Sequence, residues 1–307
     1  MKRLQNRIAE SRFALPMTAV YALSVWLAGG LVEHQRYLEF VIFAFAAYLM
    51  VELNNRNSLI RIYSRMVSCS FIVLATMNEP MFDTGGVWLT LLCFVAMFIA
   101  LFNSYQDKRA QGRVFYAFMF IGIASLLHVQ VLFFVPVVWV LMASCLMAFS
   151  NRNFWASVIG LTVPYWFFAG YSAITGQLDY FFAHFSADAW ISQPFLYEGL
   201  DVCDIAAAGC VALVAFIGMV HFLRNSYKDK IRTRMIYETL STMAIVCMVF
   251  IMAQPQHIAW LTGIMTIPAS VLIAHFFALT ATRITNITFI VLTLGFVALT
   301  VANMLFR

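Results

Sequence analysis

Eleven apolar stretches separated by short polar segments run along the sequence, each about 14 to 25 residues long. A bilayer core about 30 Å thick needs about 20 apolar residues per helix. The pattern therefore predicts an all-α polytopic transmembrane helical bundle of about eleven spans, forming one integral membrane domain over residues 1–307. The predicted spans lie near residues 13–31, 37–53, 62–77, 87–103, 114–127, 130–149, 154–175, 202–223, 236–253, 257–281 and 284–305.

Two polar breaks mark predicted turns inside long apolar regions. Residues 114–149 are too long for one span, and His128-Val129-Gln130 interrupts them. We expect a tight turn there, which leaves 114–127 as either a short full span or a re-entrant piece. The second break, Gln254-Pro255-Gln256-His257, predicts a helix end, because proline removes a backbone donor.

The loop over residues 176–201 is the longest predicted extramembrane segment and carries an apolar pattern of its own. Apolar residues recur there at helical spacing, which predicts an amphipathic helix lying on the membrane interface with Trp190 as an anchor. The residues that form this pattern are Leu178, Phe181, Phe182, Phe185 and Ala189.

The loop over residues 224–235 is strongly basic, with five basic residues against one acid. Next to membrane helices, such a loop is typical of a cytoplasmic anchor that contacts anionic lipid. A docking site for a cytoplasmic partner is the alternative interpretation.

Composition supports the membrane class independently. Of the 307 residues, 63% are hydrophobic and 11% are charged, and the mean hydropathy is +0.85. Soluble domains carry about 25% charged residues, so this chain could not cover a water-facing surface. The six cysteines are scattered and are expected to be packing residues. The sequence indicates no metal site, no cofactor and no nucleic-acid partner.

The distribution of charge predicts the orientation in the membrane. With the N-terminus inside and the C-terminus outside, 17 of the 19 basic residues fall on the inner side. Lysine and arginine collect on the cytoplasmic side of membrane proteins. Nine of the 14 acids, and four of the six histidines, then fall on the outer side. The inner face is predicted to be basic, with few other reactive side chains.

The outer face admits two interpretations. The positive-inside bias alone leaves acids outside, so the pattern requires no site. Alternatively, outer carboxylates and imidazoles line an outward-facing catalytic site. Glu33 is then the candidate catalytic base, and Arg36 could pair with a lipid-linked phosphate. The candidate substrate-binding residues are His34, Arg36, Glu79, Asp83, His128, Gln130, His184, Asp188, Gln256 and His257.

Three short segments resemble an uncharacterised family of Bacteroidota inner-membrane proteins, domain-of-unknown-function family 6427. They are Glu52-Leu53-Asn54-Asn55-Arg56-Asn57-Ser58, Phe120-Ile121-Gly122-Ile123-Ala124-Ser125-Leu126-Leu127-His128 and Gly160-Leu161-Thr162-Val163-Pro164-Tyr165. The resemblance implies a multi-pass protein of the bacterial inner membrane and assigns no catalytic residue.

The arrangement is also loosely similar to GT-C-class membrane glycosyltransferases, which carry an acid in the first outer loop and use a polyprenyl-phosphate sugar donor. Glu33 stands at the matching place, although the loop here is only about five residues long. The similarity implies a cell-envelope transferase that uses a polyprenyl-phosphate-linked substrate. The alternatives are a non-catalytic scaffold bound to a membrane-protein partner, and a lipid or small-molecule transporter. The transporter ranks last, because no ionisable residue is predicted near a helix centre.

Overall fold

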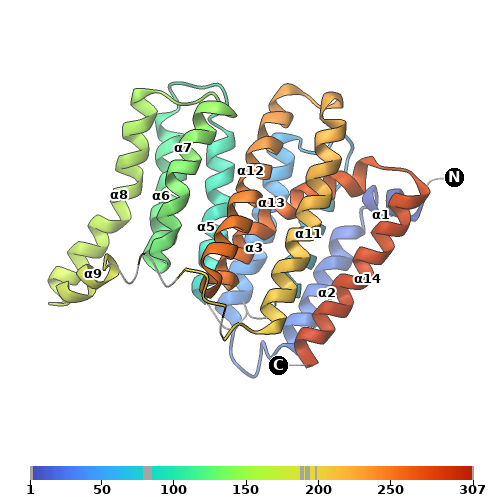
Figure 1. The fold of residues 1–307 in the computed structure, drawn as a ribbon, viewed down its shortest axis with the longest axis horizontal. Coiled ribbons are helices and arrows are strands. Elements are labelled where there is room, and N and C mark those ends of the chain that lie inside the picture. Colours follow the sequence, from blue (N-terminus) through green and yellow to red (C-terminus); the bar gives the residue numbers. More distant parts are fainter. Residues whose placement is uncertain (1–2, 79–84, 187–189, 191–193, 198, 306–307) are drawn as a thin grey trace. The chain divides into compact units, whose positions relative to one another are not determined.

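The computed structural model describes residues 3–78, 85–186, 190, 194–197 and 199–305, and every regular element among them is helical (Figure 1). The prediction of an all-α bundle is confirmed. The helices are α1 Leu4–Ala9, α2 Ala14–Ala28, α3 Tyr37–Asn57, α4 Met66–Met77, α5 Gly85–Phe102, α6 Gln111–Leu127, η2 Val129–Phe133, α7 Phe134–Ser144, α8 Asn151–Ile174, α9 Leu178–His184, α11 Val202–Asn225, η3 Ser226–Lys228, α12 Ile231–Ala253, η4 Pro255–His257, α13 Ile258–Leu279 and α14 Arg283–Leu305.

Within the described residues, seven helices are long and apolar enough to cross a membrane, which makes this an integral multi-span membrane protein. They are α3, α5, α8, α11 with η3, α12, η4 with α13, and α14. Four shorter apolar helices, of 10 to 17 residues, occupy the other predicted stretches: α2, α4, α6, and η2 with α7. At about 1.5 Å rise per residue these four fall short of a bilayer core. The count of eleven spans therefore stays a prediction.

The chain forms two compact units. The first unit contains Met1–Trp88 and Tyr197–Arg307, and the second contains Leu89–Leu196, so the division falls within α5. The two polar breaks predicted from the sequence are helix ends: α6 stops before His128, and α12 stops before Gln254. The assignment of the whole chain to one membrane domain stays a prediction.

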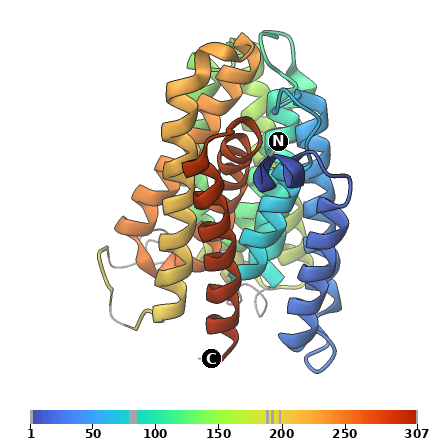
Figure 2. The same cartoon turned by 90° about the vertical axis from the view of Figure 1, so that its right-hand side faces the viewer.

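Helix α13 forms the core of the first unit and packs against α4, α11 and α12. Residues 260–278 of this helix are all buried, which suits a helix that is apolar on every side. Gly218 lets α11 approach closely, because a Cβ atom there would lie 2.7 Å from the carbonyl oxygen of Leu272. Helix α1 lies beside α14, as Figure 2 shows.

In the second unit, α6 and α8 form the central pair. Gly122 and Gly160 each face main chain of the opposite helix, as small residues do where membrane helices approach closely. A Cβ atom at Gly122 would lie 2.7 Å from the carbonyl oxygen of Leu161, and one at Gly160 would meet Phe115. The hydroxyls of Ser125 and Tyr165 are hydrogen-bonded at 2.7 Å across the same interface.

The predicted amphipathic helix of the 176–201 loop begins where expected but is short in the described residues. Helix α9 covers Leu178–His184, and residues 187–189 lie outside the described part. Phe181 packs on Phe168 of α8 at 5.4 Å between ring centroids, while Phe182 is exposed. Trp190 packs edge-on against Phe133 at 5.6 Å. A position of α9 on the membrane interface stays a prediction.

Candidate functional site

The first predicted outer turn, between α2 and α3, is exposed. Glu33 and His34 are both exposed, and Glu33 has no ion-pair partner within the described part of the chain. Arg36 donates from Nη1 to the carbonyl oxygen of Gly29 at 3.0 Å, which stabilises the turn. The ring of His34 covers Gly30, whose φ of +83° favours glycine.

The other outer candidates in the first unit have mixed surroundings. Gln256 is exposed, and half-buried His257 lies 5.7 Å from the ring of Trp260. Glu79, Asp83 and Asp188 lie outside the described residues. Three pockets in the described part of the first unit have volumes of about 660, 350 and 740 Å³. None of the predicted outer residues lines them.

In the second unit, His184 has a structural environment. Its Nε2 lies 3.0 Å from the carbonyl oxygen of Ser125, and the rings of Tyr165, Phe168 and Phe185 surround it. Burial lowers the pKa of His184, so the neutral form is favoured and Nε2–H donates to that carbonyl. This contact holds α9 against the end of α6.

His128 and Gln130 follow the end of α6 in the same unit. Gln130 is buried and His128 is half-buried. His184 contacts the carbonyl oxygen of Ser125, and His128 follows Ser125 by three residues in the sequence. The imidazoles of His128 and His184 therefore lie near the same end of α6. A substrate role for these outer residues, and a catalytic role for Glu33, stay predictions.

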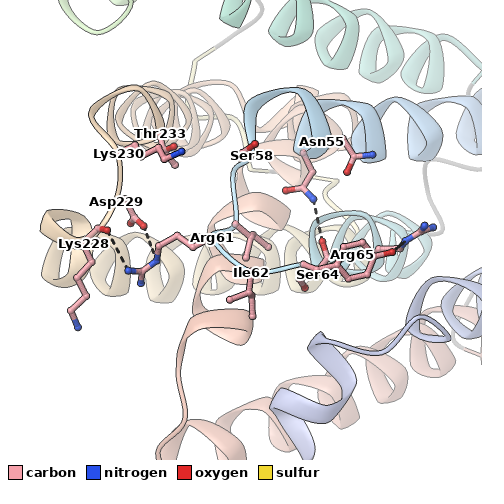
Figure 3. A pocket seen from close by; sticks show the side chains of 13 residues that line it. Asn55, Ser58, Arg61, Ile62, Ser64, Arg65, Lys228, Asp229, Lys230 and Thr233 are labelled. Carbon is pink, nitrogen blue, oxygen red and sulfur yellow. Dashed lines mark hydrogen bonds and ion pairs between the residues drawn. The ribbon is translucent and has the colours of Figure 1, made fainter.

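A basic pocket of about 660 Å³ lies elsewhere in the first unit and includes part of the basic loop 224–235 (Figure 3). Two loops form it: the segment that joins α3 to α4 and the segment that joins α11 to α12. Its lining contains four basic side chains and, among the described lining residues, one carboxylate. The residues are Asn54, Asn55, Ser58, Ile60, Arg61, Ile62, Tyr63, Ser64, Arg65, Lys228, Asp229, Lys230 and Thr233.

Local hydrogen bonds fix the first loop. Helix α3 ends at Asn57, and Ser58 adopts the left-handed conformation with φ +48°. Asn54 Nδ2 donates to the carbonyl oxygen of Ser64 at 3.2 Å, which closes the loop, as Figure 3 shows. Ser64 Oγ then accepts from Met66 N at 3.2 Å, at the start of α4.

Asp229 joins the second loop to the first (Figure 3). Its side chain is only 1% exposed, and its Oδ1 lies 3.1 Å from Nε of Arg61 as an ion pair. Arg61 also donates from Nη1 to the carbonyl oxygen of Lys228 at 3.3 Å. A buried carboxylate is costly unless it is paired, so these contacts hold the Arg61 guanidinium at the pocket wall.

Two histidines continue this network into the helices. His275 of α13 is fully buried, and its Nε2 lies 3.1 Å from Asp229 Oδ2. A carboxylate can only accept, so Nε2–H donates, and Nδ1 of a neutral His275 is left as an acceptor. His221 Nδ1 lies 3.3 Å from that atom and donates to it.

Two further contacts tie α12 to the loop after α3. Arg232 donates from Nη2 to Asn57 Oδ1 at 3.0 Å. The hydroxyl of Tyr237 donates to the carbonyl oxygen of Leu59 at 3.4 Å, and its ring lies 4.9 Å from that of His275. These two hydrogen bonds hold α12 against the end of α3 and the loop that follows it.

The arrangement is suited to binding an anion. Arginine guanidinium groups and lysine ammonium groups bind phosphate oxygens through charge-assisted hydrogen bonds. The pocket also contains amide and hydroxyl side chains, and the first backbone N–H groups of α12, which begins after Lys230, have no partner inside the helix. Where the chain is described, no group of three or more metal-ligating side chains is suited to a metal ion.

The candidate site residues predicted from the sequence include none that line this pocket, because the basic inner loop was attributed first to membrane orientation and anionic-lipid contact, with partner docking as the alternative. One available signal was Asp229, the single acid within the basic loop. The other was the position of His221 and His275, each near one end of a long apolar helix. Their meeting depends on which helices are neighbours, which the sequence does not state.

Comparisons with protein-family models, curated proteins and solved structures gave no match. The resemblance to family 6427 and the similarity to GT-C transferases therefore stay predictions. The interpretation of the pocket depends on its own geometry.

Proposed function

We propose that this chain is a multi-pass membrane protein that acts as a non-catalytic binding subunit, and that the basic pocket holds a phosphate-bearing ligand on the cytoplasmic side. The observation that carries the proposal is the Arg61 guanidinium, held in place by buried Asp229 at the wall of a basic pocket of about 660 Å³. A volume of this size is in the range of about 300–1,000 Å³ typical of ligand sites.

The proposed topology has eleven spans, with the N-terminus inside. Contacts between predicted inner segments of the first unit support it. Gln5, near the N-terminus, donates from Nε2 to the carbonyl oxygen of Phe277 at 2.6 Å, and Arg61 pairs with Asp229. At the predicted outer side, Asn303 donates from Nδ2 to the carbonyl oxygen of Met77 at 2.9 Å.

The second unit supports the same topology. Ser150 Oγ donates to the carbonyl oxygen of Lys108 at 2.8 Å, and Asn153 Nδ2 donates to that of Asp107 at 3.2 Å. These residues belong to two predicted inner segments. His184 and Ser125, in contact with each other, belong to the predicted outer side. The four short helices then cross as spans, in a bilayer that we propose is the bacterial inner membrane.

Binding is favoured over catalysis because Asp229, the carboxylate of the pocket lining, is already paired with Arg61 and His275. A base occupied in this way is poorly placed to accept a substrate proton. A membrane-protein partner fits a binding subunit and stays a proposal. The outer-face transferase with Glu33 as base, and the transporter, stay predictions that no geometry described above favours.

The experiment is calorimetric titration of the purified full chain with pyrophosphate. Arg61→Gln removes a wall guanidinium, and we expect the affinity to fall about tenfold, the size of one charge-assisted hydrogen bond. Because this variant also breaks the ion pair with Asp229, Lys230→Gln is the second test. Lys230 is exposed and lines the pocket, so its loss is expected to lower affinity about threefold while the fold is kept.

Arg224→Gln is the matched control. Arg224 is an exposed basic residue at the end of α11 that does not line the pocket. We expect its affinity for pyrophosphate to equal that of the unmodified chain. The proposal would be contradicted if Arg61→Gln and Lys230→Gln bound pyrophosphate as tightly as the Arg224→Gln control. It would also be contradicted if the unmodified chain did not bind pyrophosphate.

A further inference from the structure

An apolar groove of about 350 Å³ opens on another part of the first unit, among α2, α4, α13 and α14. Its floor is formed by buried side chains, among them Phe277, Phe289 and Phe296. Its rim includes Phe13 and Met17, which are 77% and 68% exposed. An apolar groove with an exposed apolar rim on a membrane protein is accessible to a lipid chain from the bilayer.

A charged hollow of about 740 Å³ adjoins one end of this groove. It is lined by Arg12 and Arg65, together with Glu10 and Tyr63. Arg12 stands between two groove residues, Ser11 and Phe13, and Arg65 directly precedes another, Met66. Both arginines are exposed, and Arg65 donates from Nε to the hydroxyl of Tyr63 at 3.2 Å. Two arginines against one carboxylate leave this end of the groove basic.

One hydroxyl inside the groove has no partner. Ser70 is 8% exposed, and its Oγ makes no hydrogen bond within the described residues. The other groove hydroxyls have partners, because Thr18 and Thr293 donate to carbonyl oxygens of their own helices and Ser11 Oγ accepts from Phe13 N. A buried hydroxyl without a partner is destabilising, so an acceptor from a ligand would stabilise it.

We propose that the groove holds an acyl chain of an anionic glycerophospholipid, whose phosphate lies at Arg12 and Arg65 and whose ester carbonyl accepts a hydrogen bond from Ser70. Ser70 follows Arg65 by five residues, which is about 7 Å along a helix. In such a lipid the ester groups lie between the phosphate and the chains. The order of the groups along α4 therefore matches the order of groups in the lipid.

The groove shares no lining residue with the basic pocket, whereas Ile62, Tyr63 and Arg65 line both the pocket and the hollow. A free phosphate could reach the arginines but would leave the groove and Ser70 unused. The apolar volume and the unpartnered hydroxyl together favour a ligand that has both a phosphate and a hydrocarbon chain.

The test is native mass spectrometry of the full chain, delipidated and mixed with equal amounts of phosphatidylglycerol and phosphatidylcholine of the same chain length. We expect one retained lipid, with phosphatidylglycerol preferred about tenfold or more, since each arginine contributes about fivefold. Arg12→Gln combined with Arg65→Gln should remove the preference. Arg7→Gln, at an exposed arginine of α1 outside the groove and the hollow, should leave it unchanged.

Ser70→Ala tests the hydrogen bond without a large change in packing, and should lower phosphatidylglycerol retention about fivefold. Ser68→Ala, on the same helix but outside the groove, is its control and should have no effect. An unchanged lipid preference in the double arginine variant would overturn the proposal. Displacement of the lipid by excess glycerol 3-phosphate would also overturn it, because the site would then recognise phosphate alone.

Discussion

Two acids of the first unit, Asp229 and Glu33, show how differently the two predicted membrane sides are built. The side chain of Asp229 is 1% exposed and contacts Arg61 and His275 at 3.1 Å each. Glu33 is exposed, and where the chain is described it forms no ion pair. Both acids stand in polar turns between helices, so local sequence alone would not separate them.

The difference is explained by desolvation. A buried carboxylate is tolerated only when it is paired, whereas an exposed one is solvated by water. The Asp229 carboxylate therefore positions Arg61, and both Arg61 and His275 depend on its negative charge. Glu33 is unconstrained, which is compatible with a solvated turn and also leaves its carboxylate accessible. The comparison shows that an acid that is buried and paired is better evidence of an organised site than an exposed acid in a turn.

The largest expected effect comes from removing Asp229. Asp229→Ala leaves Arg61 without its ion-pair partner and His275 with a buried, unpaired Nε2–H. Breaking a buried pair from one side typically costs about 3–5 kcal/mol, so we expect the free energy of unfolding to fall by about 3 kcal/mol. The measurement is reversible unfolding of the purified chain in mixed micelles.

Glu33→Ala is the control for that prediction, since an exposed acid without a partner contributes little. We expect a change of less than about 0.5 kcal/mol. A loss for Glu33→Ala as large as that for Asp229→Ala would show that the two acids are equally important to the fold, which contradicts the comparison.

A smaller effect separates the arginines that accompany these two acids. Arg61 uses Nε toward Asp229 and Nη1 toward the carbonyl oxygen of Lys228, so a lysine could replace only one contact. We expect Arg61→Lys to lower the free energy of unfolding by about 1 kcal/mol.

Arg36→Lys is the matched variant at the outer turn. Arg36 donates from Nη1 to the carbonyl oxygen of Gly29, and a lysine at this position could donate to the same oxygen. We expect less than about 0.5 kcal/mol, measured in the same unfolding assay. Equal losses for the two variants would contradict the expectation that the Arg61 guanidinium, which contacts both Asp229 and the carbonyl oxygen of Lys228, is the harder of the two to replace by lysine.

Much of the fold could be predicted from the sequence because apolar length determines where membrane helices form. The breaks at His128 and at Gln254 are helix ends, and Gly122 and Gly160 lie where α6 and α8 approach most closely. The spacing of apolar residues along the sequence does not identify which helices pack against one another. The close approach at Gly218, against Leu272 of α13, depends on which helix packs beside α11.

The site was less predictable for a related reason. The sequence separates Arg61, Asp229 and His275 widely, and each has a plain local explanation in a basic loop or an apolar helix. Their meaning comes from tertiary contacts that bury Asp229 with His275 and place the exposed Arg61 beside them. His184 shows another contact that the sequence does not reveal, because its ring nitrogen meets the carbonyl oxygen of Ser125, 59 residues earlier in the chain, while its predicted substrate role stays a prediction.

The central claim, a cytoplasmic pocket for a phosphate-bearing ligand, is tested most directly by labelling Asn55→Cys with a membrane-impermeant maleimide. Asn55 is exposed and lines the pocket, and Arg224→Cys is the control outside it. We predict that both cysteines react in inside-out vesicles, that neither reacts from the outer side, and that pyrophosphate slows only the reaction at position 55. Labelling of position 55 from the outer side, or at an unchanged rate with pyrophosphate, would contradict the account.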